Sequence, residues 1–89
     1  MHIDLVYQQE DERVHQVRHN LRDALGMLDL PPRWAEFRVG GTTPPPAYAA
    51  GVATPAVFVE GGVVGKPHDH PPTRAEIFLA VQDVTSRRR

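Results

Sequence analysis

The stretch that decides the fold is residues 51–65, GVATPAVFVEGGVVG, in which Pro55 stands directly before the apolar run 56–59. A short apolar run bounded by turn residues predicts a buried strand. Glycine accepts positive φ without steric cost, so the Glu-Gly-Gly at 60–62 predicts a tight turn, with residues 63–65 as the returning strand. Proline has no N–H to donate to a ladder, and the first residue of a strand can do without that donor.

Outward from this hairpin, residues 2–7 and 33–39 alternate between apolar and polar positions, which predicts two further strands. Between them, Asp11 is a good N-cap for a helix of about 18 residues that ends before Pro31-Pro32. The apolar stripe of this helix is Val14, Val17, Leu21, Ala24, Leu25 and Leu28.

The segment 40–51 predicts a loop with a short helical piece near residues 47–50. After the rigid loop 66–72, Thr73 and Glu76 form a capping-box pattern that starts a last helix. Its apolar face is Ile77, Phe78, Val81 and Val84. We expect one domain over residues 1–83 and a basic, frayed tail over residues 84–89.

The element order is β-α-β-(α)-β-β-α, which predicts an α/β fold with a four-stranded mixed sheet. The first two strands are joined through a helix, so they should be parallel, and the two long helices should cover one face together. The chain has 89 residues and a net charge of −1, which gives no bias toward nucleic acid. With no signal peptide and no apolar stretch of about 20 residues, we expect a cytoplasmic protein without membrane contact.

The order of elements and the ATPAVFV segment, followed by a glycine-containing hairpin, resemble the thioredoxin/glutaredoxin-like fold over about residues 2–82. In that family the proline before the third strand is usually cis, and the residue before it pairs with an extended peptide or a thiol ligand. The resemblance therefore implies a cis Thr54–Pro55 bond beside the first helix, with Thr54 and Pro55 in the binding site.

The family's redox cysteines are missing from this chain, which has no cysteine at all. The matching positions after the first strand are Asp11 and Val14. Thiol–disulfide exchange requires a thiolate, so we expect no disulfide reductase activity. The leading hypothesis is a non-catalytic, redox-inactive thioredoxin-like module, without a cofactor, that binds a protein segment or a second copy of itself.

A competing hypothesis is that the protein binds a small anionic or thiol ligand, or acts on it as an enzyme. Its site would consist of Tyr7, Thr54 and the helix arc that carries Arg18 and Arg22. In related transferases a tyrosine at the end of the first strand hydrogen-bonds a thiolate. The alternatives are purely structural: Tyr7 packs under the first helix, and the arginines form a solvated helix face.

Two histidine pairs are weak metal candidates: His15 and His19 one helical turn apart, and His68 and His70 in a proline-bracketed loop. Neither pair is a complete site, and a third ligand for the loop pair would have to come from His2 or elsewhere. We therefore expect no metal site and treat these side chains as surface histidines.

Trp34 falls on the face of the second strand opposite to Phe37, and this strand should lie at a sheet edge. An uncovered edge is a template for pairing with another chain, and tryptophan is common at binding hot spots. We expect self-association or partner binding at this edge. The alternative is that Trp34 packs under the Pro-rich loop around Pro44, Pro45 and Pro46.

Overall fold

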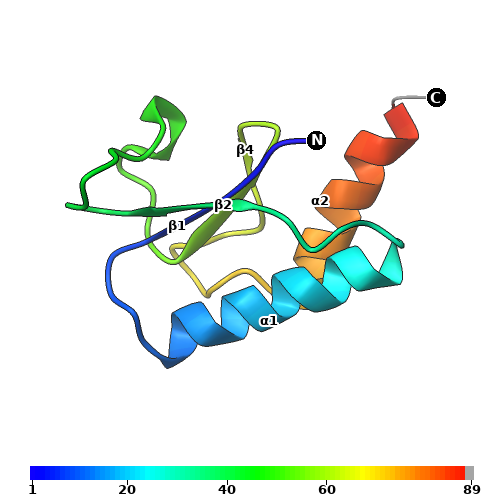
Figure 1. Ribbon diagram of the computed structural model, residues 1–89, viewed down its shortest axis with the longest axis horizontal. Coiled ribbons are helices and arrows are strands. Elements are labelled where there is room, and N and C mark those ends of the chain that lie inside the picture. The colour runs from blue at the N-terminus through cyan, green and yellow to red at the C-terminus, as the bar shows by residue number, and fades with distance from the viewer. Residues whose placement is uncertain (88–89) are drawn as a thin grey trace.

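The computed structural model describes residues 1–87 and contains one four-stranded sheet in the order β2-β1-β3-β4 (Figure 1). The strands are β1 (Ile3–Tyr7), β2 (Ala35–Arg38), β3 (Ala56–Val59) and β4 (Gly62–Val63). β1 pairs in parallel with β2 and antiparallel with β3, and β3 pairs antiparallel with β4. The predicted α/β class and the mixed sheet are confirmed, with β2 shorter than the expected range 33–39.

The helix α1 (Glu12–Met27) joins β1 to β2 and begins where the sequence predicts. The Asp11 carboxylate accepts the backbone N–H groups of Arg13 and Val14 at 3.1 and 3.3 Å. These are two of the donors that the first turn of a helix leaves unpaired. After the helix, Asp29 turns the chain with φ 56, and the following prolines prevent further helix.

The first strand of the hairpin, β3, has the predicted boundaries, whereas β4 is Gly62–Val63 and not the expected 63–65. The Thr54–Pro55 bond that enters the hairpin is cis. Its turn places Glu60 and Gly61 at positive φ, 51 and 80. All four residues of β3 are buried, in agreement with an apolar strand in the middle of the sheet.

The helix α2 (Arg74–Arg87) starts at the predicted capping box. Thr73 N–H donates to Glu76 Oε1 at 3.0 Å, and Glu76 N–H donates to Thr73 Oγ1 at 3.2 Å. The helix extends through residues 84–87, which the sequence predicts to be part of the tail; residues 88 and 89 lie outside the described part of the chain. An ion pair between Arg87 and Asp83 at 3.0 Å supports the added turn.

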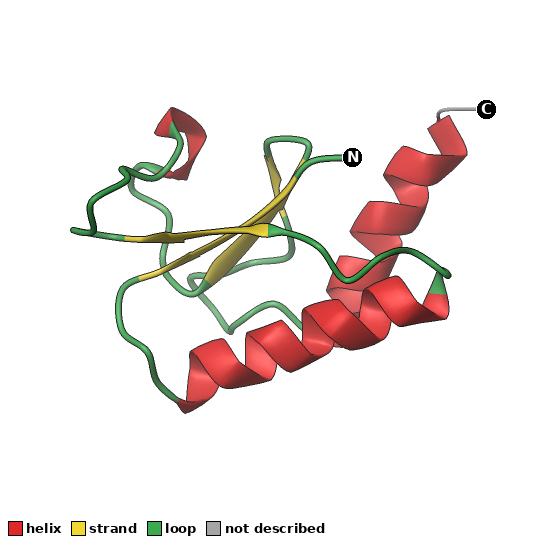
Figure 2. Cartoon of the chain, viewed as in Figure 1, coloured by secondary structure: helices red, strands yellow, loops and turns green. Residues whose placement is uncertain are grey.

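The two faces of the sheet differ in what covers them (Figures 1 and 2). Both long helices cover one face, where Leu5, Leu21 and Ile77 belong to the larger buried cluster. The opposite face carries a smaller cluster around Val6 and Phe58, covered by the short helix η1 (Ala47–Ala49) and its flanking loops. Among residues 1–87, no helix is long and apolar enough to cross a lipid bilayer.

Candidate functional site

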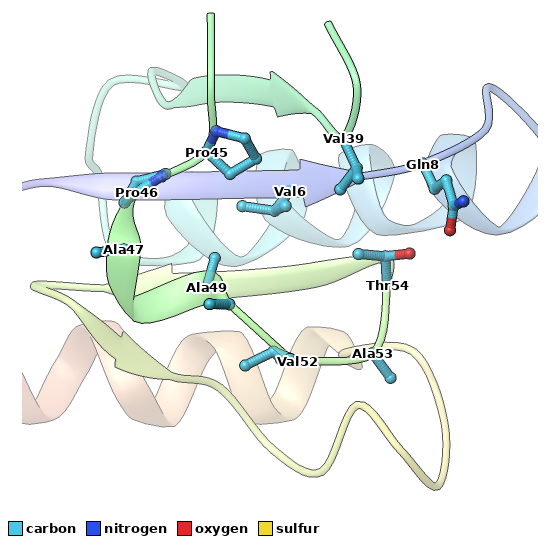
Figure 3. Close-up of a pocket in the computed structure, with 12 residues that line it drawn as sticks. Val6, Gln8, Val39, Pro45, Pro46, Ala47, Ala49, Val52, Ala53 and Thr54 are labelled. Carbon is cyan, nitrogen blue, oxygen red and sulfur yellow. The ribbon is translucent and has the colours of Figure 1, made fainter.

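A hollow of about 410 Å³ lies between the end of β1 and the segment that leads into β3 (Figure 3). Val6 and Val39 form one wall, and the opposite wall comes from the η1 region and the chain that follows it. The lining is mostly apolar: Val6, Val39, Pro45, Pro46, Ala47, Ala49, Ala50, Val52 and Ala53, with Gln8, Gly51 and Thr54. Such a lining suits an aliphatic or aromatic side chain.

A second hollow, of about 230 Å³, adjoins the first at Gln8 and Thr54, which line both. It reaches the first turn of α1 at Arg13 and Val14, and Pro55 forms part of its wall. The Asp11 carboxylate holds Arg13 at 3.2 Å, and its pKa lies below the ordinary value because the Val14 N–H and then Arg13 donate to it. The two hollows thus form one groove, apolar at one end and polar at the other.

The backbone between the two hollows, at Ala53 and Thr54, lies outside the strands and is unpaired. Within residues 1–87, neither the N–H nor the C=O of Ala53 or Thr54 makes a hydrogen bond. Both residues are only half-buried, and the β1–β3 ladder ends at the pair of Val6 and Ala56. A segment with free donors and acceptors beside a groove can pair with an added extended chain.

The structure brings Tyr7 and Arg18 together but separates them from Thr54. The Arg18 guanidinium lies 5.4 Å from the centre of the Tyr7 ring, and Tyr7 packs against the helix-side cluster. Neither residue lines a hollow with Thr54. The three residues of the competing ligand hypothesis therefore do not surround one cavity.

Arg18 also forms ion pairs with two carboxylates. It binds Glu10 at 2.6 Å and Glu36 at 2.9 Å, and its side chain is 23% exposed. The hydrogen bond from Arg18 lowers the pKa of Glu10 to about 2 and is the first cause of a lowered pKa at Glu36. Arg22 is exposed, and no ion pair within residues 1–87 includes it. The helix arc therefore offers an incoming anion one free arginine rather than two.

Three of the four candidate histidines lie beside a carboxylate, and the fourth, His68, is exposed. His15 lies 3.2 Å from Glu10, His19 lies 3.2 Å from Asp23, and His70 lies 3.0 Å from Glu76. No group of three or more metal-ligating side chains occurs in the described part of the chain.

Trp34 is half-buried and packs against the helix-side cluster, so it does not lie under the Pro-rich loop, which covers the other face. Its indole N–H donates to Glu36 at 2.9 Å. The strand that follows it, β2, is an edge of the sheet, as predicted.

A buried carboxylate was not anticipated from the sequence. Asp4, the second residue of β1, is fully buried. Its Oδ2 accepts a hydrogen bond from the Tyr48 hydroxyl, and His2 Nε2 lies 2.8 Å from Oδ1 without hydrogen-bond geometry. The signal was an aspartate at an alternating position of an otherwise apolar strand, but its partner Tyr48 is 44 residues away.

Comparison of the chain with protein-family models, with curated proteins and with solved structures finds no match in any of the three.

Proposed function

We propose that this protein is a non-catalytic thioredoxin-like interaction module that binds an extended protein segment along residues 53–54. The observation that carries the proposal is the unpaired, half-buried backbone of Ala53 and Thr54 between two adjoining hollows. An added strand would gain main-chain hydrogen bonds there, and its alternate side chains would enter the groove.

The lining of the groove suggests the chemistry of the segment. One side chain, aliphatic or aromatic, fits the hollow between Val6 and Val52. The neighbouring part of the segment meets the polar hollow with Gln8, Gln9 and Arg13. The chain has no cysteine, so it cannot exchange thiols with the bound segment, and the activity proposed for the groove is binding.

Peptide display against the immobilised protein tests the proposal. Selected peptides should be extended and carry an apolar residue, and on binding they should protect the Thr54 amide from hydrogen exchange. Ala53→Glu introduces a charge into the apolar hollow and should abolish capture, whereas Ala75→Glu, on an exposed position of α2, should not. Peptides that bind Ala53→Glu equally well, or that leave the Thr54 amide unprotected, would show that the groove is not the binding site.

A further inference from the structure

The outer edge of β2 is open, and its backbone groups face away from the sheet. Val39 N–H donates to Tyr7 C=O at 2.8 Å, so the backbone of Val39, and by alternation that of Ala35 and Phe37, points to β1. The backbone of Glu36 and Arg38 therefore points outward. Within residues 1–87, the one outward group that makes a hydrogen bond is Arg38 C=O, which accepts from Gly41 N–H at 2.9 Å, and a carbonyl has a second lone pair.

The side chains at this edge carry opposite and separated charges. Glu36 and Glu10 share the single guanidinium of Arg18, which leaves an excess negative charge beside the strand. Arg38 lies two residues further on the same face and is exposed; among the described residues its side chain makes one long contact, 3.4 Å from Nε to Gln8 C=O. Glu36 also accepts the Trp34 indole N–H at 2.9 Å, but Glu10, Glu36 and Arg18 together keep a formal charge of −1. Each copy of the chain therefore offers one acidic position and one exposed basic position along the same edge.

Antiparallel pairing of two β2 strands about Phe37 satisfies both charges at once. This register places Glu36 opposite Arg38 of the second copy, and the two-fold symmetry repeats the pair. Glu36 and Arg38 are the residues with outward backbone groups, so each such pair can exchange both N–H···O bonds. The opposite face then brings Phe37 against Phe37 of the second copy, an aromatic cross-strand pair.

Neighbouring symmetric registers are less favourable. Centring the pairing on Glu36 or on Arg38 sets two carboxylates or two guanidinium groups directly opposite, and like charges in that position are destabilising. The charge pattern of the edge thus selects one register.

We infer that β2 is a homodimer edge, at which two copies of the chain join their sheets antiparallel with the two-fold axis at Phe37. The inference rests on the edge of β2 and not on the groove at Thr54, so either can fail alone.

A single engineered cysteine tests the register, because the natural chain contains none. In the inferred dimer, the two copies of residue 37 form a non-hydrogen-bonded pair with Cα atoms about 4.5 Å apart, within the range that a disulfide spans. Phe37→Cys should therefore give a disulfide-linked dimer under mild oxidation. Ala35→Cys, on the same face but with its copies about 13 Å apart, should remain unlinked. Equal linkage of the two variants, or none at Phe37→Cys, would overturn the inference.

Charge reversal supplies a second test that separates association from folding. Arg38→Glu alone and Glu36→Arg alone each place like charges opposite each other and should weaken self-association about tenfold in sedimentation. A mixture of the two variants restores opposite charges at both pairs and should associate at least as well as the natural chain. If each variant keeps a folded circular dichroism spectrum and the mixture associates no better than the variants alone, the inferred pairing is wrong.

Discussion

At the scale of single residues, the interaction of Tyr48 with Asp4 links a loop to the sheet. Asp4 is fully buried, and a buried carboxylate is costly unless hydrogen-bond donors compensate it. The Tyr48 hydroxyl is that donor, and the Tyr48 ring also contacts Phe58 at 5.2 Å between centroids. The hydrogen bond to Asp4 raises the pKa of Tyr48 to about 12, because losing the proton would set two negative charges together.

Tyr48→Phe should lower the free energy of unfolding by about 1–3 kcal/mol at neutral pH, because Asp4 loses its donor while remaining buried. The matched control is Tyr7→Phe, which removes a hydroxyl that has no hydrogen-bond partner within residues 1–87. Chemical unfolding measures both variants. If both variants lose the same free energy of unfolding, the Tyr48 hydroxyl adds nothing to stability and Tyr48 contributes through its ring alone.

The same pair predicts how stability depends on alkaline pH. A folded-state pKa raised from 10.0 to about 12 contributes stability that is complete below pH 10 and is lost as pH rises through 12. Tyr7→Phe leaves Tyr48 as the only tyrosine, so absorbance titration of that variant should report a midpoint near 12. A midpoint near 10 in the folded variant would contradict the proposed hydrogen bond.

At the scale of elements, Arg18 ties together α1, the loop before it and β2. Its partners are Glu10 in the loop and Glu36 in β2, and its guanidinium also lies over the Tyr7 ring of β1. Four separate segments thus meet at one side chain. These charges are partly exposed, so each ion pair alone contributes little to the free energy of unfolding. Together the bidentate contacts of Arg18 fix the position of α1 against the edge strand.

Arg18→Gln should reduce the acid sensitivity of the fold. The Glu10 pKa is lowered from 4.5 to about 2 mainly by the Arg18 hydrogen bond, so this contribution is present above pH 4.5 and lost as pH falls through 2. Without Arg18, the free energy of unfolding should start lower at neutral pH and fall less between pH 4.5 and 2. Arg22→Gln, an exposed arginine of the same helix, should keep the natural slope. A slope that Arg18→Gln leaves unchanged would mean that Glu10 does not titrate through Arg18.

At the scale of the whole molecule, the sequence predicted what depends on local chemistry. Periodicity, the Asp11 cap, the Thr73 box and the tight turn after β3 can be read from neighbouring residues, and the structure has each of them, although the turn is Glu60–Gly61 and Gly62 already belongs to β4. The parallel pairing of β1 and β2 follows from the crossover helix, and the position of β2 at an edge of the sheet follows from the strand order.

The features that the sequence did not predict depend on residues far apart in the chain. The side chains that meet at Arg18 come from positions 10 and 36, and the donor to Asp4 comes from position 48. Tyr7, Thr54 and Arg18 looked like one ligand site because each lies near the same end of β1 or α1. The structure does not gather them around one cavity, since Tyr7 packs against the helix-side cluster and neither Tyr7 nor Arg18 lines a hollow with Thr54. Alternation along a strand gives the face of a residue but not the distance to its partners.

The final prediction concerns how residues 40–54 open, since this segment forms one wall of the groove. Its own backbone bonds are few and local: Ala49 N–H to Pro46 C=O at 3.0 Å, Ala50 N–H to Ala47 C=O at 3.1 Å and Val52 N–H to Ala49 C=O at 3.2 Å. The small cluster around Val6 and Phe58 and the Tyr48–Asp4 hydrogen bond attach it to the sheet. We therefore expect the segment to open at a lower free energy than the helix-side core, as loops with few buried contacts do.

Native-state hydrogen exchange measures this directly. The amides of Ala49, Ala50 and Val52 should exchange at a lower free energy than that of Leu21 in α1, whose side chain is fully buried. Tyr48→Phe should speed their exchange about tenfold in excess of any change at Leu21, because it weakens the attachment of the segment more than the core. Equal free energies at all four amides in the natural chain would mean that the segment opens only on global unfolding. In that case the groove is a rigid part of the fold, and a bound segment would have to fit it as it stands.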